Sequence, residues 1–301
     1  MELKQLQTFR AVATELSFTR AAEVLAYAQS SVTAQIQGLE QQFGVPLFNR
    51  LGKRVAITEE GKRLLFYAER MLQLADEAQL AVRGDDEPSG TLRIGAPESL
   101  FTYRLPPILR EFRSRCPKVE LHFKPDFYPG HLGLRREVMQ GTVDVALFFN
   151  YPRLSDTLIV EQLLQETLLL IAEPDHPLTR LETVLPGKLE GEVILLTEAG
   201  CTYRELFEQI LRGANVHPAT KLEFASVEAI KQCVMAGMGI GFLPEIAVRA
   251  EISSGRMTAL RWSGEELSVV THLAWHKDKW ISPALRVFLE LVKQLSAFEH
   301  Q

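Results

Sequence analysis

Residues 28–44 read AQSSVTAQIQGLEQQFG, and this stretch decides the fold of the N-terminal part of the chain. Apolar side chains recur at the spacing of one helix face, at Val32, Ile36, Leu39 and Phe43. The opposite face carries hydroxyl, amide and methyl groups without charge, whereas a merely solvated face usually carries Lys and Glu. The sequence therefore predicts a helix with an apolar back and an uncharged, hydrogen-bonding front, ended by the glycine that closes the stretch.

Helical patterns precede this stretch, and a strand pattern follows it. Residues 3–16 predict a first helix, and Ser17 is the expected N-cap of a second helix that starts at position 18. The expected inward side chains of these two helices are Leu3, Leu6, Phe9, Val12, Ala13, Leu16, Phe18, Ala21, Ala22 and Leu25. Residues 45–57 predict two short strands around a basic turn. Helix, turn, helix and wing is the order of a winged helix-turn-helix domain.

A long helical pattern covers residues 59–83, with Thr58 as its expected N-cap. Its apolar seam consists of Leu64, Leu65, Ala68, Met71, Leu72, Ala75 and Ala78. A seam sustained over about 25 residues usually packs against another helix, so we expect a dimerisation helix. Packing on its own domain is the alternative. The polar, breaker-rich residues 84–90 then predict a linker.

Composition and charge limit the class of protein. The chain has 301 residues, of which 46% are hydrophobic and 24% charged, as in ordinary globular proteins. No apolar run reaches the roughly 18 residues of a membrane span, and no secretory signal is visible. Three cysteines without paired spacing (Cys116, Cys201 and Cys233) fit a reducing cytoplasm. Residues 1–58 carry a net charge of +2 and the remainder −7, which gives a slightly basic head on an acidic body.

Strand and helix patterns alternate from residue 88 to the end, in two successive units. Alternation of this kind predicts a mainly parallel sheet, with residues 102–117 forming one of its helices. The last strand and helix can return to the first unit, so we expect a hinged α/β domain of two lobes. The expected division is a winged helix-turn-helix at 1–58, a linker helix and hinge at 59–87, and an effector domain at 88–301, with lobe I at about 91–161 and 267–301 and lobe II at about 162–266.

These segments, in this order, resemble the LysR-type transcriptional regulators. The head contains FTRAAEVL, AQSSVTAQIQGLE, FGVPLFNR and ITEEGKRLL, and the body contains LPPILREFRSRCPKVEL, QGTVDVAL, EPDHPL and SVEAIKQCVMAGMGIGFLP. The resemblance covers essentially the whole chain. It implies a cytoplasmic, homo-oligomeric DNA-binding regulator. The C-terminal domain would be similar in fold to type 2 periplasmic binding proteins and would hold a small effector between its lobes.

The uncharged front of the 28–44 helix is suited to base edges in the major groove. The candidate base-reading residues are Gln29, Ser30, Ser31, Thr33 and Gln37. Similar proteins commonly have arginines where this chain has Ala34, Gln37 and Gly38. We therefore expect phosphate contacts from Arg20, Arg50, Lys53 and Arg54. A dimer should prefer an interrupted inverted repeat in double-stranded DNA. The resemblance alone implies that a tetramer bends the DNA and that the protein contacts RNA polymerase.

Three loops are expected at the crevice beyond the carboxyl ends of the strands. The candidate effector-binding residues are Ser99, Leu100, Thr102, His131, Gly200, Cys201, Thr202, Tyr203 and Arg204. In similar regulators, hydroxyl groups and backbone N–H groups on such loops hold the effector, and His131 departs from the usual Ser or Thr. Converging helix N-termini favour an anion. Arg204 either binds a carboxylate or forms a structural salt bridge.

The run GCTYR, residues 200–204, resembles a subset of regulators of central carbon metabolism, some of which respond to citrate. A small carboxylate is therefore the expected ligand. Cys201 is expected to be an inert thiol, because no second cysteine lies close in sequence. His272 and His276 have the spacing of metal ligands on a helix but fall in a strand-like segment, and Asp144 is expected to be structural.

Other functional classes explain less of the sequence. A solute-binding protein would account for the body but not for the head. An enzyme with a DNA-binding head would need a nucleophile–base pair or a phosphate loop, and none is visible, so we expect no catalytic residue, cofactor or metal. A DNA-bending protein without a ligand would need no crevice. The favoured interpretation is a ligand-responsive transcriptional regulator.

Overall fold

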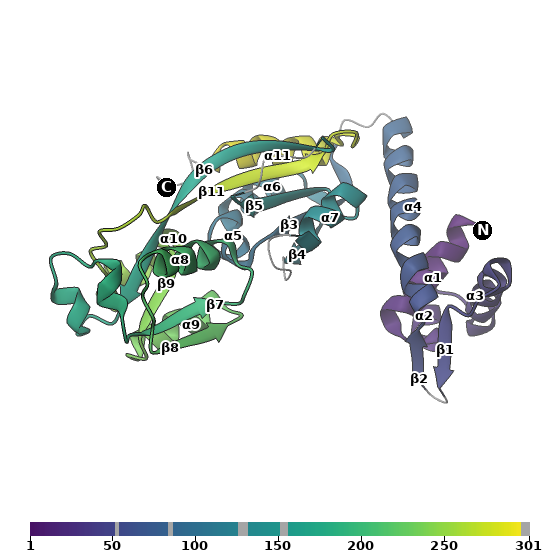
Figure 1. Ribbon diagram of the computed structural model, residues 1–301. Helices are drawn as coiled ribbons and strands as arrows, with labels where there is room; N and C mark the ends of the chain where they lie inside the picture. Colours follow the sequence, from purple (N-terminus) through teal and green to yellow (C-terminus); the bar gives the residue numbers. More distant parts are fainter. Residues whose placement is uncertain (52–53, 84–86, 126–131, 151–155, 296–301) are drawn as a thin grey trace. The chain divides into compact units, whose positions relative to one another are not determined.

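The computed structural model describes residues 1–51, 54–83, 87–125, 132–150 and 156–295 (Figure 1). The chain divides into two units, Met1–Asp86 and Glu87–Gln301. No helix in these described ranges is long and apolar enough to cross a membrane. The first unit contains α1 Leu3–Glu15, α2 Phe18–Leu25, α3 Gln29–Phe43, β1 Phe48–Leu51, β2 Arg54–Ile57 and α4 Glu59–Arg83.

One apolar core holds the first unit together. It is formed by side chains of all four helices and of the wing strands, at Leu6, Phe9, Val12, Phe18, Ala21, Ala22, Val32, Ile36, Leu39, Leu47, Phe48, Ala68 and Leu72. Phe48, the first residue of β1, lies with its ring centroid 5.4 Å from that of Phe9 and 5.9 Å from that of Phe18. The wing strands pair antiparallel, with Phe48 opposite Ile57. The predicted winged helix-turn-helix is confirmed.

The helix ends follow the capping residues in the sequence. The Ser17 side chain accepts a hydrogen bond from the Arg20 backbone N–H at 3.3 Å, and the Thr58 hydroxyl accepts one from the Gly61 N–H at 2.9 Å. Gly44 ends α3 in the left-handed conformation, with φ +70°. A Cβ on Gly61 would clash with the Leu47 carbonyl oxygen. That close approach explains why glycine, and not a capping-box glutamate, stands at the third position of α4.

The buried face of each helix is shorter than the sequence pattern suggests. Leu3, Leu16 and Phe43 were expected to point inward but are 47%, 47% and 43% exposed. Each lies at or just beyond a helix end, where the neighbouring helices no longer cover it. The inward expectation was therefore wrong for these three side chains.

The predicted seam of α4 divides between two environments. Ala68 and Leu72 are buried in the core of the first unit, and Leu64 and Leu65 pack against it. Met71 is exposed, as is Ala78 farther along the helix. The N-terminal half of the seam thus packs on its own domain, which was the alternative interpretation. Among the α4 side chains that the structure describes, the large apolar ones that stay exposed are Tyr67, Met71, Leu74 and Val82.

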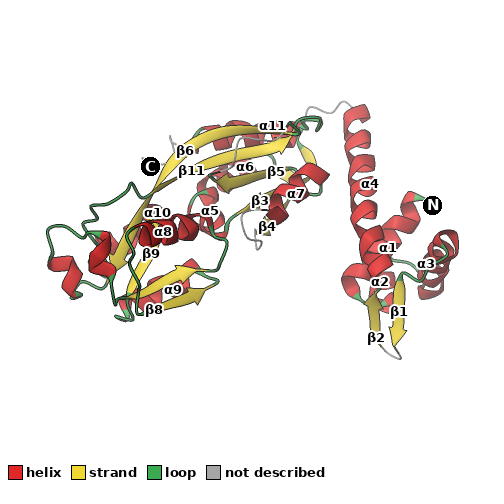
Figure 2. Ribbon diagram, viewed as in Figure 1, coloured by secondary structure: helices red, strands yellow, loops and turns green. Residues whose placement is uncertain are grey.

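The second unit is built on one mixed sheet with the strand order β4-β3-β5-β11-β6-β9-β7-β8, while β10 pairs with β6 (Figure 2). Its elements are β3 Ser89–Ala96, α5 Glu98–Tyr103, α6 Leu105–Arg115, β4 Lys118–Pro125, α7 Leu132–Gln140, β5 Val145–Phe149, β6 Leu158–Ala172, the 3-10 helices η2 Pro177–Arg180 and η3 Pro186–Leu189, β7 Val193–Thr197, α8 Thr202–Gly213, β8 Thr220–Phe224, α9 Val227–Met235, β9 Ile240–Pro244, α10 Glu245–Ser253, β10 Thr258–Ala259, β11 Ser268–His276 and α11 Pro283–Lys293.

The sheet contains two parallel groups of three strands, β4-β3-β5 and β8-β7-β9. The long strands β6 and β11 pair antiparallel with each other, β11 pairs with β5, and β6 pairs with β9. The first group with its helices forms lobe I, and the second forms lobe II. Helix α11 returns to lobe I, where Phe288 lies edge-on to Phe112 of α6 with the ring centroids 6.0 Å apart. The predicted two-lobe α/β class is confirmed.

Two details of the second unit differ from the sequence-based expectation. Residues 102–117 do not form one helix, because α5 ends at Tyr103 and α6 begins at Leu105, directly before two prolines. Strand β6 begins at Leu158, earlier than the expected start of lobe II, and continues through 15 residues. Asp144 is structural as expected, since its carboxylate accepts from the Arg93 N–H at 2.7 Å and pairs with Lys279 at 2.8 Å.

A buried ion pair fixes the junction of α5 and α6 to β6. The Arg104 Nε donates to Glu166 Oε1 at 2.7 Å, and the two side chains are only 6% and 2% exposed. Thr271 of β11 also approaches this carboxylate, with its hydroxyl 3.4 Å from Oε1. Removal of the arginine would leave a buried carboxylate without its counter-charge.

We expect Arg104→Met to lower the free energy of unfolding of the second unit by about 3–5 kcal/mol, as for other broken buried pairs. Urea denaturation of the full chain measures the change. Arg115→Met is the matched control, because the Arg115–Glu111 pair is exposed and should contribute about 0.5 kcal/mol or less. Equal losses of unfolding free energy in the two variants would contradict the expectation that the Arg104–Glu166 pair stabilises the second unit.

Candidate functional site

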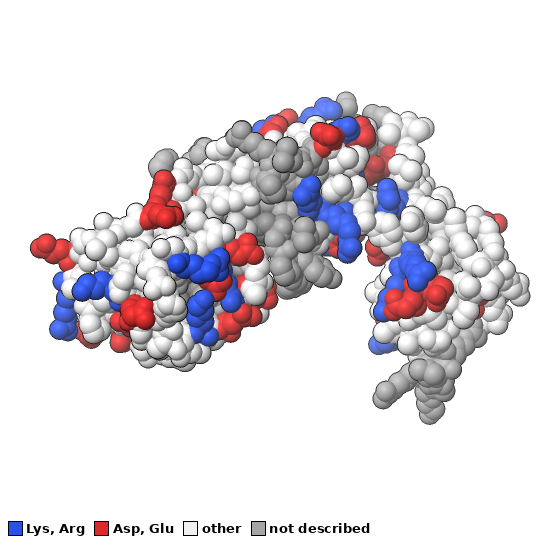
Figure 3. Space-filling view, in the orientation of Figure 1, with Lys and Arg blue, Asp and Glu red and all other residues white. Residues whose placement is uncertain are grey.

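The exposed face of α3 carries almost no charge. Gln29, Ser30, Ser31, Ala34 and Gln37 are exposed and Thr33 is half-buried, in agreement with the predicted polar front. In Figure 3 most of the surface over α3 is neither basic nor acidic. The charged residue of this helix, Glu40, accepts hydrogen bonds from the backbone N–H groups of Leu47 and Phe48 at 2.8 and 3.3 Å. Its carboxylate therefore joins α3 to the wing.

The candidate phosphate-binding residues belong to α2 and to the wing region, which precede and follow α3 in the chain. Arg20 is in the first turn of α2, and its side chain is 65% exposed. Its Nη2 donates to the Glu15 carbonyl oxygen at 2.6 Å, which holds the guanidinium at the protein surface. Arg50 and Arg54 belong to β1 and β2, and Lys53 lies outside the described residues.

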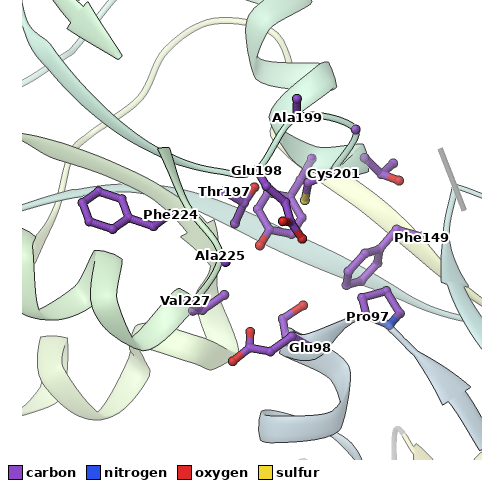
Figure 4. Close-up of a pocket in the computed structure, with 14 residues that line it drawn as sticks. Pro97, Glu98, Phe149, Thr197, Glu198, Ala199, Cys201, Phe224, Ala225 and Val227 are labelled. Atoms are coloured by element: carbon purple, nitrogen blue, oxygen red, sulfur yellow. The ribbon is translucent and has the colours of Figure 1, made fainter. Parts of the chain in front are cut away.

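A pocket that is partly open to solvent lies between the two lobes of the second unit (Figure 4). It is lined by Pro97, Glu98, Ser99, Phe149, Thr197, Glu198, Ala199, Gly200, Cys201, Thr202, Tyr203, Phe224, Ala225 and Val227. These residues follow or end β3, β5, β7 and β8, or begin α5, α8 and α9. The pocket thus lies at the carboxyl ends of parallel strands, where the open α/β architecture leaves a crevice.

The structure brings five of the nine candidate effector residues to this pocket: Ser99, Gly200, Cys201, Thr202 and Tyr203. Leu100 is only 1% exposed and belongs to the apolar core. Thr102 is exposed one turn along α5, outside the pocket lining. His131 lies outside the described residues.

Arg204 does not belong to the pocket lining. Its Nη1 donates to the Thr197 carbonyl and to the Glu223 carboxylate, and its Nε pairs with Glu208 at 3.3 Å. Burial lowers the pKa of this guanidinium, but the hydrogen bonds and charges of Glu223 and Glu208 outweigh it, so the net shift is upward. The geometry therefore supports a structural salt bridge for Arg204, and not a role in binding a carboxylate in the pocket.

The sequence-based list missed much of the lining. Phe149 and Phe224 end β5 and β8, and Thr197 ends β7, so the rule about strand carboxyl ends could have found all three. The candidates were instead selected mainly as polar residues of the loops. Ala225 lies in the turn before α9 and Val227 is the first residue of that helix, which supplies the third helix start at the pocket.

Aromatic rings connect the lobes at the pocket wall. Phe149 of lobe I and Tyr203 of lobe II meet edge-on, with their ring centroids 5.9 Å apart. Burial raises the pKa of Tyr203 well above its usual value, so its hydroxyl stays protonated. Burial also raises the pKa of the Cys201 thiol, which disfavours the reactive thiolate, as expected for an inert cysteine.

Helix α8 begins at the pocket without a side-chain cap. Its N-cap residue is Cys201, and this side chain makes no capping hydrogen bond. By contrast, the N-cap of α9 is Ser226, whose hydroxyl accepts from the Ala229 N–H at 3.4 Å. The first turn of α8 therefore directs the positive end of its helix dipole and its backbone N–H groups toward the pocket, where the Cys201 thiol, a weak acceptor, interacts with the Tyr203 and Arg204 N–H groups.

Glu98 brings a negative charge to the opposite side of the pocket, beside Val227 (Figure 4). Burial raises the pKa of this carboxyl, and interactions with the Thr102 hydroxyl and the Val227 backbone N–H offset part of the increase. One carboxylate oxygen, Oε2, is buried without a hydrogen-bond partner within the described structure. Glu98 is thus an incompletely satisfied acceptor at the pocket wall.

A buried lysine joins the lobes next to Glu98. Lys231 of α9 pairs with Glu228 at 3.0 Å and with Glu251 at 3.1 Å. It also lies 3.4 Å from the Tyr103 hydroxyl of α5 and 5.2 Å from the centroid of that ring. This contact bridges lobes I and II, so a change in the angle between the lobes would have to alter it.

The ranges that the structure describes contain no group of three or more His, Cys, Asp or Glu side chains that could hold a metal ion. His272 and His276 both lie in β11, as the strand-like sequence indicated.

We expect Glu98→Gln to raise the unfolding temperature of the unliganded protein at pH 7. A carboxyl whose pKa is raised on folding stabilises the native state when protonated, and this contribution is lost as pH rises above the usual value of 4.5. The advantage of the variant should therefore grow from about pH 4.5 toward neutral pH. Thermal unfolding at a series of pH values measures it, and a difference that is independent of pH would contradict the assignment.

Comparison with known proteins agrees with this architecture. Residues 3–62 match the family model described as "Bacterial regulatory helix-turn-helix protein, lysR family", and residues 85–297 match "LysR substrate binding domain". The uncharacterized HTH-type transcriptional regulator YwqM of Bacillus subtilis (strain 168) is 48% identical over 294 residues, which cover 98% of this chain and 99% of YwqM. The HTH-type transcriptional regulator GltR of the same organism is 32% identical over 293 residues, 96% of this chain and 95% of GltR.

Two solved structures share the fold over nearly the whole chain. Full-length CbnR complexed with its target DNA has a TM-score of 0.71 at 25% identity and covers 98% of this chain and 100% of that chain. A full-length OxyR variant from Pseudomonas aeruginosa has a TM-score of 0.73 at 24% identity, with 98% and 94% covered. The chain therefore belongs to the LysR family: it is a DNA-binding transcriptional regulator with a substrate-binding domain, and not an enzyme.

Proposed function

We propose that this regulator recognises an interrupted inverted repeat through two copies of α3, and that a small carboxylate in the interlobe pocket changes its affinity for that DNA. The observation that carries the proposal is the pairing of an exposed, uncharged polar helix face with a separate crevice at the strand ends. The proposal also implies that the protein works in the compartment that holds the chromosome, the cytoplasm.

The exposed polar face of α3 is proposed to contact the bases. Amide and hydroxyl side chains at Gln29, Ser30, Ser31, Thr33 and Gln37 can both donate to and accept from base edges. They do so without the desolvation cost of a charge. The exposed methyl of Ala34 suits contact with a thymine methyl group.

Phosphate contacts fall to the residues beside α3. Arg20 is exposed at the start of α2, and a phosphate could replace the Glu15 carbonyl as partner of its guanidinium. Arg50, Lys53 and Arg54 of the wing region are proposed for the same role on their sequence positions alone. These contacts would fix the register of the protein on DNA and make binding depend on salt.

The variants Arg20→Ala and Gln29→Ala separate these roles. Selection from a pool of genomic fragments supplies a bound sequence, and a scrambled copy serves as the control DNA. We expect Arg20→Ala to weaken binding to both DNAs by a similar factor, about three- to tenfold, and to reduce the salt slope by about one. Gln29→Ala should weaken mainly the selected sequence, by about 1–3 kcal/mol. Mobility-shift titrations in which both variants lose affinity equally on both DNAs would contradict the division.

The dimer that presents two copies of α3 is proposed to form through the exposed apolar side of α4. Tyr67, Met71, Leu74 and Val82 recur at helical spacing on that side and are 53%, 39%, 66% and 87% exposed. Exposed apolar side chains in a row are expected to pack against an equivalent helix. The buried half of the predicted seam is already used by the first unit itself.

We expect Leu74→Glu to shift the full chain from dimer toward monomer, because it would bury a charge in the helix pair. Gln79→Glu adds the same charge on a different side of α4 and should leave the assembly unchanged. Sedimentation velocity at several protein concentrations distinguishes the two variants. An unaltered sedimentation coefficient for Leu74→Glu, with its fold intact, would rule out this side of α4 as the dimer contact.

The ligand is proposed to place a carboxylate at the first turn of α8. That helix has no side-chain cap and begins at the pocket, so its backbone donors and dipole favour a negative group. A ligand that touches both lobes would favour one interlobe angle over another and shift the population between two arrangements. Transmission to RNA polymerase and assembly into a tetramer are further parts of the proposal that rest on family resemblance.

A further inference from the structure

The charge balance of the pocket restricts which carboxylates it can accept. Two of the described lining residues, Glu98 and Glu198, are acids, and this part of the lining contains no lysine or arginine. Arg204 directly follows the lining residue Tyr203 in the sequence, but its guanidinium is already paired with Glu223 and Glu208. A bound anion would therefore be stabilised by backbone donors of α8 and would have Glu98 on the other side of the pocket.

Glu98 and Thr197 both lack hydrogen-bond partners that a ligand could supply. Glu98 Oε1 accepts from the Thr102 hydroxyl only at a long 3.4 Å, the Val227 backbone N–H also interacts with the carboxyl, and Oε2 is buried without a hydrogen-bond partner within the described chain. The Thr197 side chain lines the same pocket, is 8% exposed and has an unpartnered buried hydroxyl. Buried polar atoms are nearly always paired in native proteins, so these atoms indicate a missing donor.

We infer that the pocket takes a small monocarboxylate that also carries a hydroxyl or ammonium group, which donates to Glu98, and that it rejects dicarboxylates and tricarboxylates. The inference rests on the carboxylate site proposed at α8 and adds the second functional group. A second carboxylate would lie in a partly desolvated pocket with Glu98 and Glu198, where like charges repel, and the nearby cation Lys231 is already paired with Glu228 and Glu251.

The hydroxyl and ammonium forms differ in their expected pH dependence. An ammonium group favours the ionised form of Glu98, whose pKa burial raises. Binding of an amino acid should therefore strengthen as pH rises through the pKa of Glu98. Binding of a hydroxy acid should depend less on pH, because a hydroxyl can donate to the carboxylate and accept from the protonated carboxyl.

Two matched sets of acids test the inference on the full-length protein. The four-carbon set is butyrate, 2-aminobutyrate, 4-aminobutyrate, 2-hydroxybutyrate, 4-hydroxybutyrate and succinate, and the six-carbon set contains the corresponding derivatives of hexanoate with adipate as the diacid. Thermal shift ranks them, and titration calorimetry gives affinities. In at least one set we expect an amino or hydroxy acid to bind about ten- to hundredfold more tightly than the unsubstituted acid, and the diacid to bind most weakly.

Glu98→Gln identifies the acceptor. This variant should lose at least about tenfold in affinity for the amino acid and should narrow or reverse the discrimination against the diacid. Glu120→Gln on the exposed strand β4 makes the same chemical change away from the pocket and should keep the wild-type ranking. A circular dichroism spectrum that matches the wild type shows that each variant is folded.

The outcomes separate this inference from the proposed function. Tight binding of unsubstituted acids or diacids, or an unchanged ranking in Glu98→Gln, would overturn the inference and leave the carboxylate site standing. Binding of alkylammonium ions or alcohols that carry no carboxylate would overturn the site at α8. Absence of binding by every acid at 10 mM, about the weakest affinity of interest for a metabolite sensor, would count against both.

Discussion

The antiparallel pairing of β6 with β11 is the constraint on which the effector-binding domain depends. Strand β6 is 15 residues long and pairs with β11 over most of its length, while each of these strands also pairs with one of the two parallel groups. The register shifts between Thr271 and His272, next to the buried Arg104–Glu166 pair. A shift of this kind bends a strand locally. The lobes are thus joined by a continuous but bent ribbon, and the pocket lies where their strand ends face each other.

This arrangement explains why polar chemistry concentrates at the start of helices. Parallel strands deliver their carboxyl ends to one edge, and the following helices begin there, so α5, α8 and α9 all contribute first-turn residues to one pocket. The contact between Lys231 and Tyr103 crosses between the lobes beside it. Burial raises the pKa of the Glu98 carboxyl and the Lys231 charge lowers it, so the proposed ligand at Glu98 would act close to this contact.

Much of the fold was predictable because local signals agreed with the global pattern. Ser17, Thr58 and Gly44 cap helices where the sequence indicated, and the strand and helix order of both lobes followed from alternation. The prediction of burial was wrong for side chains at helix ends, such as Leu16 and Phe43, because periodicity does not reveal where the neighbouring helix stops. The break at Arg104 has a signal in the sequence, because Pro106 and Pro107 have no N–H to donate to the carbonyl groups of a continuous helix.

The candidate site was predictable only in outline. The loops after β3 and β7 were predicted from the crevice rule. The same rule also points to Phe149 and Phe224 at the ends of β5 and β8, but their apolar side chains do not distinguish them chemically from core residues. Arg204 shows the opposite error. Its pair with Glu208 follows from helical spacing, but its pair with Glu223 depends on the placement of β8 beside β7, which local sequence does not encode. Long-range pairing therefore decided whether a charged side chain was free to bind a ligand.

Occupancy of the interlobe pocket is proposed to change DNA binding. Ala225 is an exposed residue of the pocket lining, so Ala225→Trp can fill the pocket without disturbing the apolar core. The direct measurement is fluorescence anisotropy of a selected DNA with wild type and this variant, before and after addition of a small-metabolite extract from the host cell. The extract should change the Kd of the wild type and leave that of Ala225→Trp unchanged. An equal change in both proteins, or no change in the wild type, would contradict it.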